Sequence, residues 1–368
     1  MSFTALTFLP LLVPALSNAG GSLASEATAK PDVVAPVATE SVVYRVRQRT
    51  RLDAIEDGAE QVRWWISIPG DDRHQEVLDF RVVDAPGPWR IEREREHGNR
   101  FLFVEAEAPG ADALEAVVEF TLRRESVWVD VDPDRVGPIT DMHRQLFREE
   151  VRRDAPHMEV TWQIQAIANR ICGDESNVAL QVRELLDYVA DEADHYSKDP
   201  TKPSCGIGDA SDCLTNAGGC CTDLHSLFIS LARARGIPAR LQMGYRLLEK
   251  NVGRDDVDPG YRCWVEYFAP GYGWVPADIV EADATDGLGR TRWFSGLTSR
   301  RLWLNQGRDF VLEGAAADER INHMSLGYAE IDGVPARVLP DGDLAPQLSR
   351  TIRFVELTGE GDAALGIE

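Results

Sequence analysis

The sequence predicts an α+β fold, in which a β-rich N-terminal region precedes helices packed on an antiparallel sheet. Residues 42–125 contain runs in which apolar side chains alternate with polar or charged ones, as in strands with one buried face. Residues 164–189 instead repeat apolar side chains at the spacing of amphipathic helices. A chain of 368 residues, 43% of them hydrophobic, is long enough for two domains with full cores.

The first 19 residues have the pattern of an export signal. An apolar run covers residues 5–16, and residues 17–19 (Ser-Asn-Ala) place small side chains at the two positions that determine cleavage. The run is too short to span a bilayer as a helix, and no later stretch predicts a membrane span. We therefore expect a signal peptide at residues 1–19, a disordered tether at 20–40, and export to the periplasm or the medium.

Residues 41–130 are expected to form an N-terminal β-sandwich domain. In the clearest strand Val62, Trp64 and Ile66 share one face, because successive side chains of a strand point to opposite sides. Clusters rich in Gly, Pro, Asp and Asn follow this strand and recur near residue 98, where they predict turns. Short alternating strands joined by such turns favour two packed antiparallel sheets.

Residues 131–300 are expected to form the core that carries the helices. Apolar side chains three and four residues apart predict two amphipathic helices, at residues 164–171 and 178–189. A third apolar stripe follows two glycines at 218–219 and ends at Gly236, a residue type that commonly terminates helices.

Strands return after the third helix. Residues 239–245 predict one strand, and residues 262–268 and 273–278 predict a hairpin. These strands would form the antiparallel sheet on which the helices pack. Residues 301–368 are again β-like, and we assign them to a C-terminal β-rich extension.

The charge of the chain argues against several kinds of partner. It contains 39 Lys and Arg against 61 Asp and Glu, which gives a net charge of −22. A protein this acidic is repelled by nucleic acids and by anionic lipid surfaces. We therefore expect no nucleic-acid partner.

The six cysteines indicate no metal site. Cys205 and Cys213 bracket a Gly-rich loop and are the preferred disulfide pair in an exported chain. The cysteines between residues 205 and 221 lack the paired C-x-x-C spacing of zinc sites. We expect neither a metal nor another cofactor.

Two cysteines lie where the third helix begins. Residues 218–223 read Gly-Gly-Cys-Cys-Thr-Asp, so Cys220 and Cys221 meet the unpaired N–H groups of the helix N-terminus. These groups favour a thiolate, and Gly219 allows a sharp turn and the close approach of a substrate. We expect Cys221 to be the most acidic thiol of the chain and its N–H group to serve an oxyanion.

Three segments together resemble the transglutaminase-like superfamily, which has a papain-like cysteine fold. Besides residues 218–223, they are residues 261–266 (Tyr-Arg-Cys-Trp-Val-Glu) and 273–278 (Gly-Trp-Val-Pro-Ala-Asp). The resemblance implies a papain-like core, in which helices pack on an antiparallel sheet, and a Cys–His–Asp triad. Cys221 matches the nucleophile, and Asp278 matches the carboxylate.

The resemblance also locates a substitution in the triad. It places Gly219, Cys220 and Trp264 around the oxyanion and the substrate cleft, and it places Arg262 where the family has its histidine. A guanidinium stays protonated, so Arg262 cannot take a proton from the thiol. We expect Arg262 to stabilise a thiolate and to pair with Asp278, which leaves the site catalytically impaired.

Three functions remain open on these grounds. The first is a pseudoenzyme that binds a protein or peptide in the cleft without turnover. The second is an active thiol-dependent acyl transferase or amide hydrolase, in which Cys221 uses water or His225, one helical turn away, as its base. The third is an extracytoplasmic structural module whose β domains make the contacts. Among the other histidines, His195 is expected at the surface.

Overall fold

The structure is a computed structural model, and its described residues begin at Val37. They are residues 37–110, 112–204, 207–256, 261–285, 287–316, 320–322, 325–338 and 346–357. The predicted signal peptide at residues 1–19 and the predicted tether up to residue 36 lie outside them. The first strand already begins at Val37, so the last residues assigned to the tether belong to a strand.

The first sheet contains the longest strands of the protein. Its order is β12-β6-β1-β16, β3 also pairs with β6, and all of these pairings are antiparallel. The strands are β1 (Val37–Asp53), β3 (Gln75–Asp84), β6 (Ala113–Trp128), β12 (Gly296–Leu297) and β16 (Leu348–Leu357).

The second sheet packs against the first. Its antiparallel order is β15-β14-β2-β5-β4. The strands are β2 (Gln61–Ser67), β4 (Trp89–Arg93), β5 (Arg100–Glu107), β14 (Tyr328–Ile331) and β15 (Val334–Pro335). One buried apolar cluster joins both sheets, with Tyr44, Phe120 and Phe354 from the first and Trp64 and Leu102 from the second. The predicted N-terminal β-rich region is therefore confirmed as two antiparallel sheets packed face to face.

The residues after 300 complete sheets that begin earlier in the chain. β16 lies beside β1, and β14 lies beside β2. β13 (Arg301–Gln306) instead joins the sheet of the core. The segment expected as a C-terminal extension is thus distributed over all three sheets.

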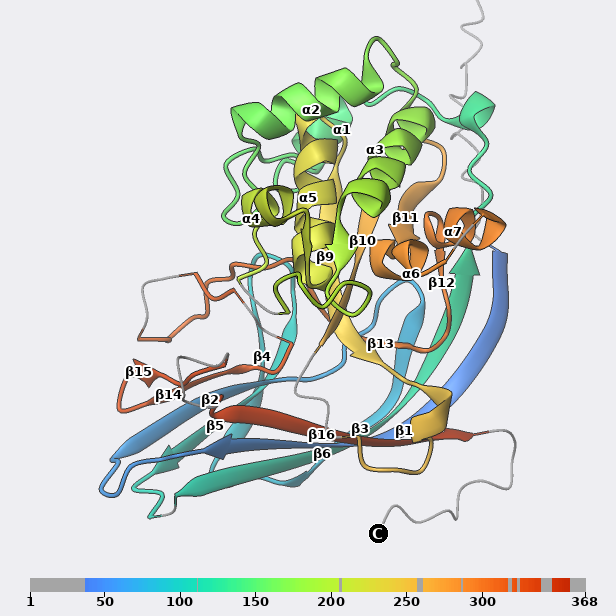
Figure 1. The fold of residues 1–368 in the computed structure, drawn as a ribbon. Helices are drawn as coiled ribbons and strands as arrows, with labels where there is room; N and C mark the ends of the chain where they lie inside the picture. Colours follow the sequence, from blue (N-terminus) through green and yellow to red (C-terminus); the bar gives the residue numbers. More distant parts are fainter. Residues whose placement is uncertain are drawn as a thin grey trace, which may run out of the picture. The chain divides into compact units, whose positions relative to one another are not determined.

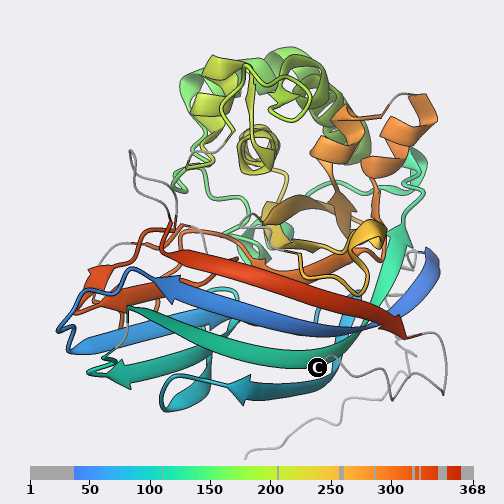
Figure 2. The same cartoon turned by 60° about the horizontal axis from the view of Figure 1, so that its bottom comes forward.

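The core consists of a four-stranded antiparallel sheet and the helices that cover it. The strand order is β11-β10-β9-β13, with β9 (Ala239–Arg246), β10 (Arg262–Ala269) and β11 (Gly273–Ala277). The main helices are α2 (Trp162–Cys172), α3 (Val178–Glu192) and α5 (Cys221–Ala234). In Figures 1 and 2 the helices lie on one side of this sheet and the two sheets of the sandwich lie on the other. This arrangement confirms the predicted α+β fold of helices packed on an antiparallel sheet.

Shorter elements surround the core. They are α1 (Asp141–Leu146), α4 (Ala210–Asn216), α6 (Ile279–Asp283) and α7 (Gly287–Trp293), two 3₁₀ turns at Pro133–Arg135 and Glu249–Asn251, and the strands β7 (Asp194–His195) and β8 (Gly218–Gly219). Within the described part of the chain, no helix is both long and apolar enough to cross a membrane.

Local sequence signals fix the ends of the main helices. The hydroxyl of Thr161 accepts a hydrogen bond from the backbone of Ile164 at the start of α2, and Asn177 caps α3 in the same way. After α5 the backbone of Gly236 adopts φ of 71°, a left-handed conformation that glycine tolerates, as the sequence predicted for the end of this helix. α5 is buried over almost its whole length, so its N-terminus is held rigidly against the sheet.

Candidate active site

The N-terminus of α5 is positioned by the short parallel pair of β7 and β8. His195 of β7 lies opposite Gly219 of β8, two residues before Cys221. A side chain at Gly219 is not tolerated, because its Cβ would lie 2.6 Å from the Oδ2 atom of Asp223. This close approach allows Oδ2 of Asp223 to accept the backbone N–H of Cys220 at 2.8 Å, which closes the first turn of the helix.

Three thiols gather at this point. Cys221 is the first residue of α5, Cys220 is its N-cap, and Cys263 lies on the neighbouring strand β10. Their exposed fractions are 6%, 4% and 2%. The thiol of Cys221 is hydrogen-bonded to those of both Cys220 and Cys263.

These surroundings do not favour the thiolate of Cys221. The hydrogen bond from Cys220 lowers the pKa of Cys221, and the nearby charge of Arg262 also lowers it. The hydrogen bond with Cys263 and burial outweigh them, so the pKa of Cys221 is raised well above that of an ordinary thiol. The expectation that Cys221 is the most acidic thiol is therefore wrong. The motif shows the helix N-terminus but not how completely the site is buried.

His225 lies beside this thiol cluster, and both of its ring nitrogens are engaged. Its Nε2 atom accepts the backbone N–H of Ile279 at 3.1 Å, which assigns the ring hydrogen of the neutral imidazole to Nδ1. Nδ1 lies 3.2 Å from the sulfur of Cys263. Complete burial lowers the pKa of His225 to about 4, so the ring is neutral near pH 7.

Asp278 is held by a different arginine from the one the sequence indicated. Its Oδ2 atom accepts a hydrogen bond from Arg301 at 2.6 Å, and its Oδ1 atom caps α6 by accepting the N–H of Glu281 at 3.2 Å. Arg301 is 2% exposed and also binds the carboxylate of Glu281 at 3.0 Å. The Nε2 atom of His225 lies 3.9 Å from Oδ1 of Asp278.

Arg262 makes a local contact at the start of β10. Its guanidinium donates to the carbonyl oxygen of Tyr261 at 2.9 Å. Its charge also reaches His195, where it is the second cause, after burial, that lowers the pKa of the imidazole to about 4. The sequence predicted that Asp278 would be unpaired without Arg262. This prediction is wrong, because Arg301 binds the carboxylate of Asp278.

Trp264 lies on the face of the sheet that points away from α5. Strand alternation turns Cys263 towards the helix and Trp264 the other way, where it is 2% exposed and packs over Gly244. Glu266, on the same face, binds Arg240 and Gln242 at 2.8 and 2.7 Å. In this structure Trp264 is a buried packing residue of the core, whereas Gly219 and Cys220 lie next to the thiol.

Sequence reasoning assigned no role to Cys263, Arg301 or His195. His195, expected at the surface, is 8% exposed, and its Nδ1 atom lies 2.7 Å from the hydroxyl of Ser197. The pairing of β7 with β8 buries it, and two-residue strands give no pattern in the sequence. Cys263 comes directly after Arg262, which stands at the position of the family histidine. This closeness in the sequence could have identified Cys263 as a site residue.

Among the described residues, the remaining cysteines form no disulfide, and the acidic groups form no cluster for a metal ion. Cys213 of α4 is fully buried and forms no disulfide, so the preferred pair with Cys205 is not made; Cys205 itself lies outside the described residues. Among the residues that the structure describes, no group of three His, Cys, Asp or Glu side chains is arranged to hold a metal ion.

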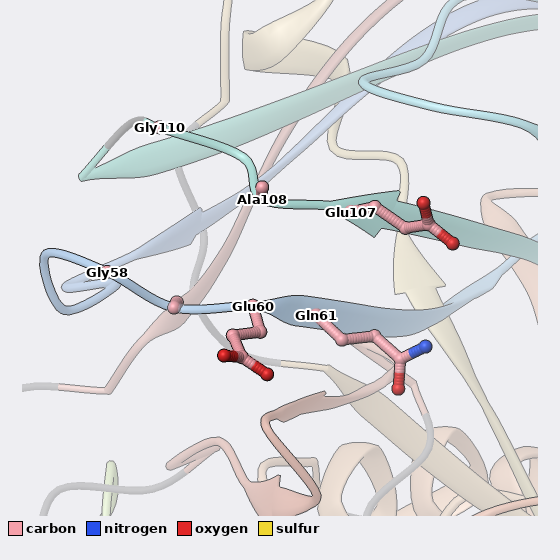
Figure 3. Close-up of a pocket in the computed structure, with 7 residues that line it drawn as sticks. Gly58, Glu60, Gln61, Glu107, Ala108 and Gly110 are labelled. Carbon is pink, nitrogen blue, oxygen red and sulfur yellow. The ribbon is translucent and has the colours of Figure 1, made fainter.

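An open hollow of about 630 Å³ lies at one end of the sandwich (Figure 3). It is lined by the segments that lead into β2 and out of β5, with Glu60, Gln61 and Glu107 as its polar side chains. None of the thiols or histidines named above lines it. The thiols and histidines described above therefore lie outside this hollow.

Comparison with known proteins agrees with this geometry. Residues 165–279 match the family model of the transglutaminase-like superfamily. An uncharacterised protein of Haemophilus influenzae is 26% identical over 357 residues, which cover 88% of this chain and 94% of that protein. The crystal structure of a candidate cysteine protease from Cytophaga hutchinsonii has a TM-score of 0.54 and 16% identity, and the match covers 86% of this chain and all of that one.

The structural likeness to the Cytophaga protein shows a shared fold over most of the chain. The family match covers α5 and the hairpin of β10 and β11, and so includes Cys221, Arg262 and Asp278. The part of the chain that holds Cys221, Arg262 and Asp278 is therefore similar to the core of the transglutaminase-like superfamily.

Proposed function

We propose that this transglutaminase-like protein binds protein or peptide segments at the core but does not complete acyl transfer. Acyl transfer from an amide requires a group that takes the proton of the thiol and returns it to the leaving amine. The observation that carries the proposal is the engagement of His225. Its Nε2 atom accepts a backbone N–H group, and its Nδ1 atom faces the sulfur of Cys263.

The two ring nitrogens of His225 cannot easily exchange these roles, in which Nε2 accepts a hydrogen bond and Nδ1 carries the ring hydrogen. To accept the proton of a thiol at Nδ1, the neutral ring would have to place its hydrogen on Nε2. That change would turn an accepted hydrogen bond into a clash of two N–H groups at Ile279. A lost buried hydrogen bond costs about 1–3 kcal/mol, and burial disfavours the charged ring as well.

Arg262, His195 and water are poor candidates for the base as well. Arg262 stays protonated and cannot accept a proton; its charge lowers the pKa of Cys221. His195 is fixed by Ser197, whose hydroxyl and backbone N–H both contact Nδ1. A water molecule as base would act on a thiol whose pKa is already raised by burial, so thiolate is scarce at neutral pH.

The choice of a polypeptide ligand rests on the fold and on the site. The Cytophaga structure with the same fold is described as a candidate cysteine protease. The site of this chain keeps a cysteine at a helix N-terminus, directly after two glycines that Asp194 and Asp223 approach closely. We further propose that the protein is exported, because residues 1–19 have the pattern of a signal peptide.

The test compares three forms of the full chain: native, Arg262→His and Cys221→Ala. Each is assayed on a glutamine donor with an amine acceptor and on peptide amides. We expect no Cys221-dependent turnover by the native protein. We expect Arg262→His to gain activity on the order of 10²-fold over the native background, because a positioned general base typically contributes that much or more.

Native turnover that disappears in Cys221→Ala would overturn the proposal. In that case His225→Gln separates the two remaining bases, since loss of activity identifies His225 and its retention identifies water. Binding is measured separately, by fluorescence polarisation with labelled carboxymethylated casein. We expect saturable binding by the native protein and by Cys221→Ala, and an absence of binding by either would remove the polypeptide ligand.

A further inference from the structure

The contacts of Cys263 place its sulfur against the first turn of α5. The sulfur lies 3.2 Å from Nδ1 of His225 and 3.7 Å from the hydroxyl of Thr222. Around the axis of α5, residue 225 lies between residues 221 and 222, because side chains four residues apart share a helix face, so the sulfur of Cys263 contacts the part of the helix that adjoins residue 221. Cys221 and Cys263 are therefore direct neighbours, and their thiols are hydrogen-bonded.

Cys220, the third thiol, also contacts Cys221, but it is tied to the cap of the helix as well. Its backbone N–H donates to Oδ2 of Asp223 at 2.8 Å, and its thiol also hydrogen-bonds to this carboxylate. At the N-cap its backbone is extended, with φ of −90° and ψ of −179°, whereas Cys221 has entered the helix. A bond between Cys220 and Cys221 would have to break this cap. Of the two thiols near Cys221, Cys263 is thus the better placed partner.

We infer that Cys221 and Cys263 form a dithiol site that reacts with small organic disulfides and closes to a disulfide between α5 and β10. This reaction is separate from acyl transfer, since it needs two sulfurs and no base that protonates an amine. This reaction would also give Cys221 a use in a site where Arg262 stands in place of the family histidine.

The reaction proceeds in two exchanges. The sulfur of Cys221, the more exposed of the pair, attacks one sulfur of the small disulfide and breaks its S–S bond. The released thiolate takes up the proton that Cys221 loses, which leaves a mixed disulfide on Cys221. The sulfur of Cys263 then attacks the Cys221 sulfur and releases the second small thiol, which takes up the proton of Cys263. The protein loses two electrons and two protons, and the small disulfide gains them.

The burial of the pair determines the order of events and their rate. Cys263 is 2% exposed and lies between His225 and Thr222, so a small disulfide meets Cys221 first. The mixed disulfide then holds its reactive sulfur beside Cys263, and the second exchange is intramolecular. Because burial also makes Cys221 a poor nucleophile at neutral pH, the first exchange is the slow one.

The test treats the native full chain with bis(2-hydroxyethyl) disulfide and follows intact mass and non-reducing peptide maps. We expect the loss of two titratable thiols, a cross-linked pair of peptides that contain Cys221 and Cys263, and little mixed disulfide. In Cys263→Ser we expect the mixed disulfide on Cys221 to accumulate instead. Cys172→Ser, which removes a distant buried thiol of α2, is the matched control and should react like the native chain.

Three outcomes would overturn the inference. They are a cross-link of Cys221 to Cys220, a mixed disulfide that persists on the native chain, and no reaction under conditions in which the urea-denatured chain reacts. The peptide map of the native chain decides among them even if Cys263→Ser fails to fold. None of these readouts depends on acyl transfer, so this inference and the proposed function fail independently.

Discussion

The two ends of the candidate site have opposite chemistry. At the Asp278 end, the carboxylate is paired with Arg301 and caps a helix, and Arg301 also pairs with Glu281. At the Cys221 end, thiols contact one another, and the thiolate of Cys221 is disfavoured. His225 lies between the two ends, bonded to a backbone amide and to a sulfur.

The difference shows that Asp278 has roles that require no histidine to orient. Asp278 has structural roles that do not depend on catalysis, because it neutralises a buried guanidinium and begins α6. Cys221 has no comparable role in the fold. The carboxylate end is therefore expected to control stability, and the thiol end is expected to control reactivity.

The largest effect is expected at Arg301. Arg301→Met keeps much of the side-chain volume but leaves Asp278 as an uncompensated buried charge, which costs about 3–5 kcal/mol of unfolding free energy. Urea unfolding measures this loss. The matched control is Arg300→Met, whose partly exposed pair with Glu356 is worth at most about 1 kcal/mol. Equal losses in the two variants would remove the distinction between the ends of the site.

A second effect is expected in the pH dependence of stability. Burial lowers the pKa of His225 in the folded state to about 4, whereas an unfolded histidine titrates near 6.5. Between these values the unfolded chain binds the additional proton, so stability falls as the pH falls from about 6.5 to about 4.

The variant His225→Gln removes this contribution. We expect the pH slope of its unfolding free energy in that window to be smaller than that of the native chain by up to about 1.4 kcal/mol per pH unit, which corresponds to one proton. The burial of His195 and His97 also lowers the pKa of each to about 4, so the comparison with the native chain is the informative quantity. An unchanged slope would mean that the ring of His225 is charged in the folded state.

A third effect is expected at the thiol end. Because the pKa of Cys221 is raised by the Cys263 hydrogen bond and by burial, its alkylation by iodoacetamide at pH 7 should be about tenfold or more slower than in the denatured chain. The rate should still be rising at pH 9. Peptide-resolved mass spectrometry measures both. A rate that reaches its plateau below pH 8 would show a stabilised thiolate at Cys221.

The smallest effect is expected at Arg262. Arg262→Ala should change the unfolding free energy by no more than about 1 kcal/mol, because Asp278 keeps its bond to Arg301. Thermal unfolding of this variant and of Arg301→Met under one set of conditions gives the comparison. A loss at Arg262 as large as that at Arg301 would show that both arginines hold the carboxylate end.

Local patterns in the sequence predicted most of the fold and half of the site. Periodicity and end signals identified α2, α3, α5 and the hairpin of β10 and β11, and the resemblance to the transglutaminase-like superfamily indicated Cys221 and Asp278 as site residues. These features depend on residues that are near one another in the chain.

The features that the sequence did not reveal depend on contacts between distant segments. Arg301 reaches Asp278 because β13 pairs with β9 and so enters the core sheet. The raised pKa of Cys221 results from the packing of β10 on α5. Neither contact leaves a periodic signal, because strand order and depth of burial are properties of the assembled sheet.

The central position of β1 in its sheet has a consequence for biosynthesis. β1 lies between β6 and β16, and its register with β16 runs from Val43 opposite Leu357 to Leu52 opposite Leu348. The first described strand thus waits for the last one, and one edge of β1 stays unpaired until residues 348–357 have been made. Such long-range pairing is slow, and an unpaired edge invites association between nascent chains. A chain cut short before β16 should therefore depend on chaperones to stay in solution.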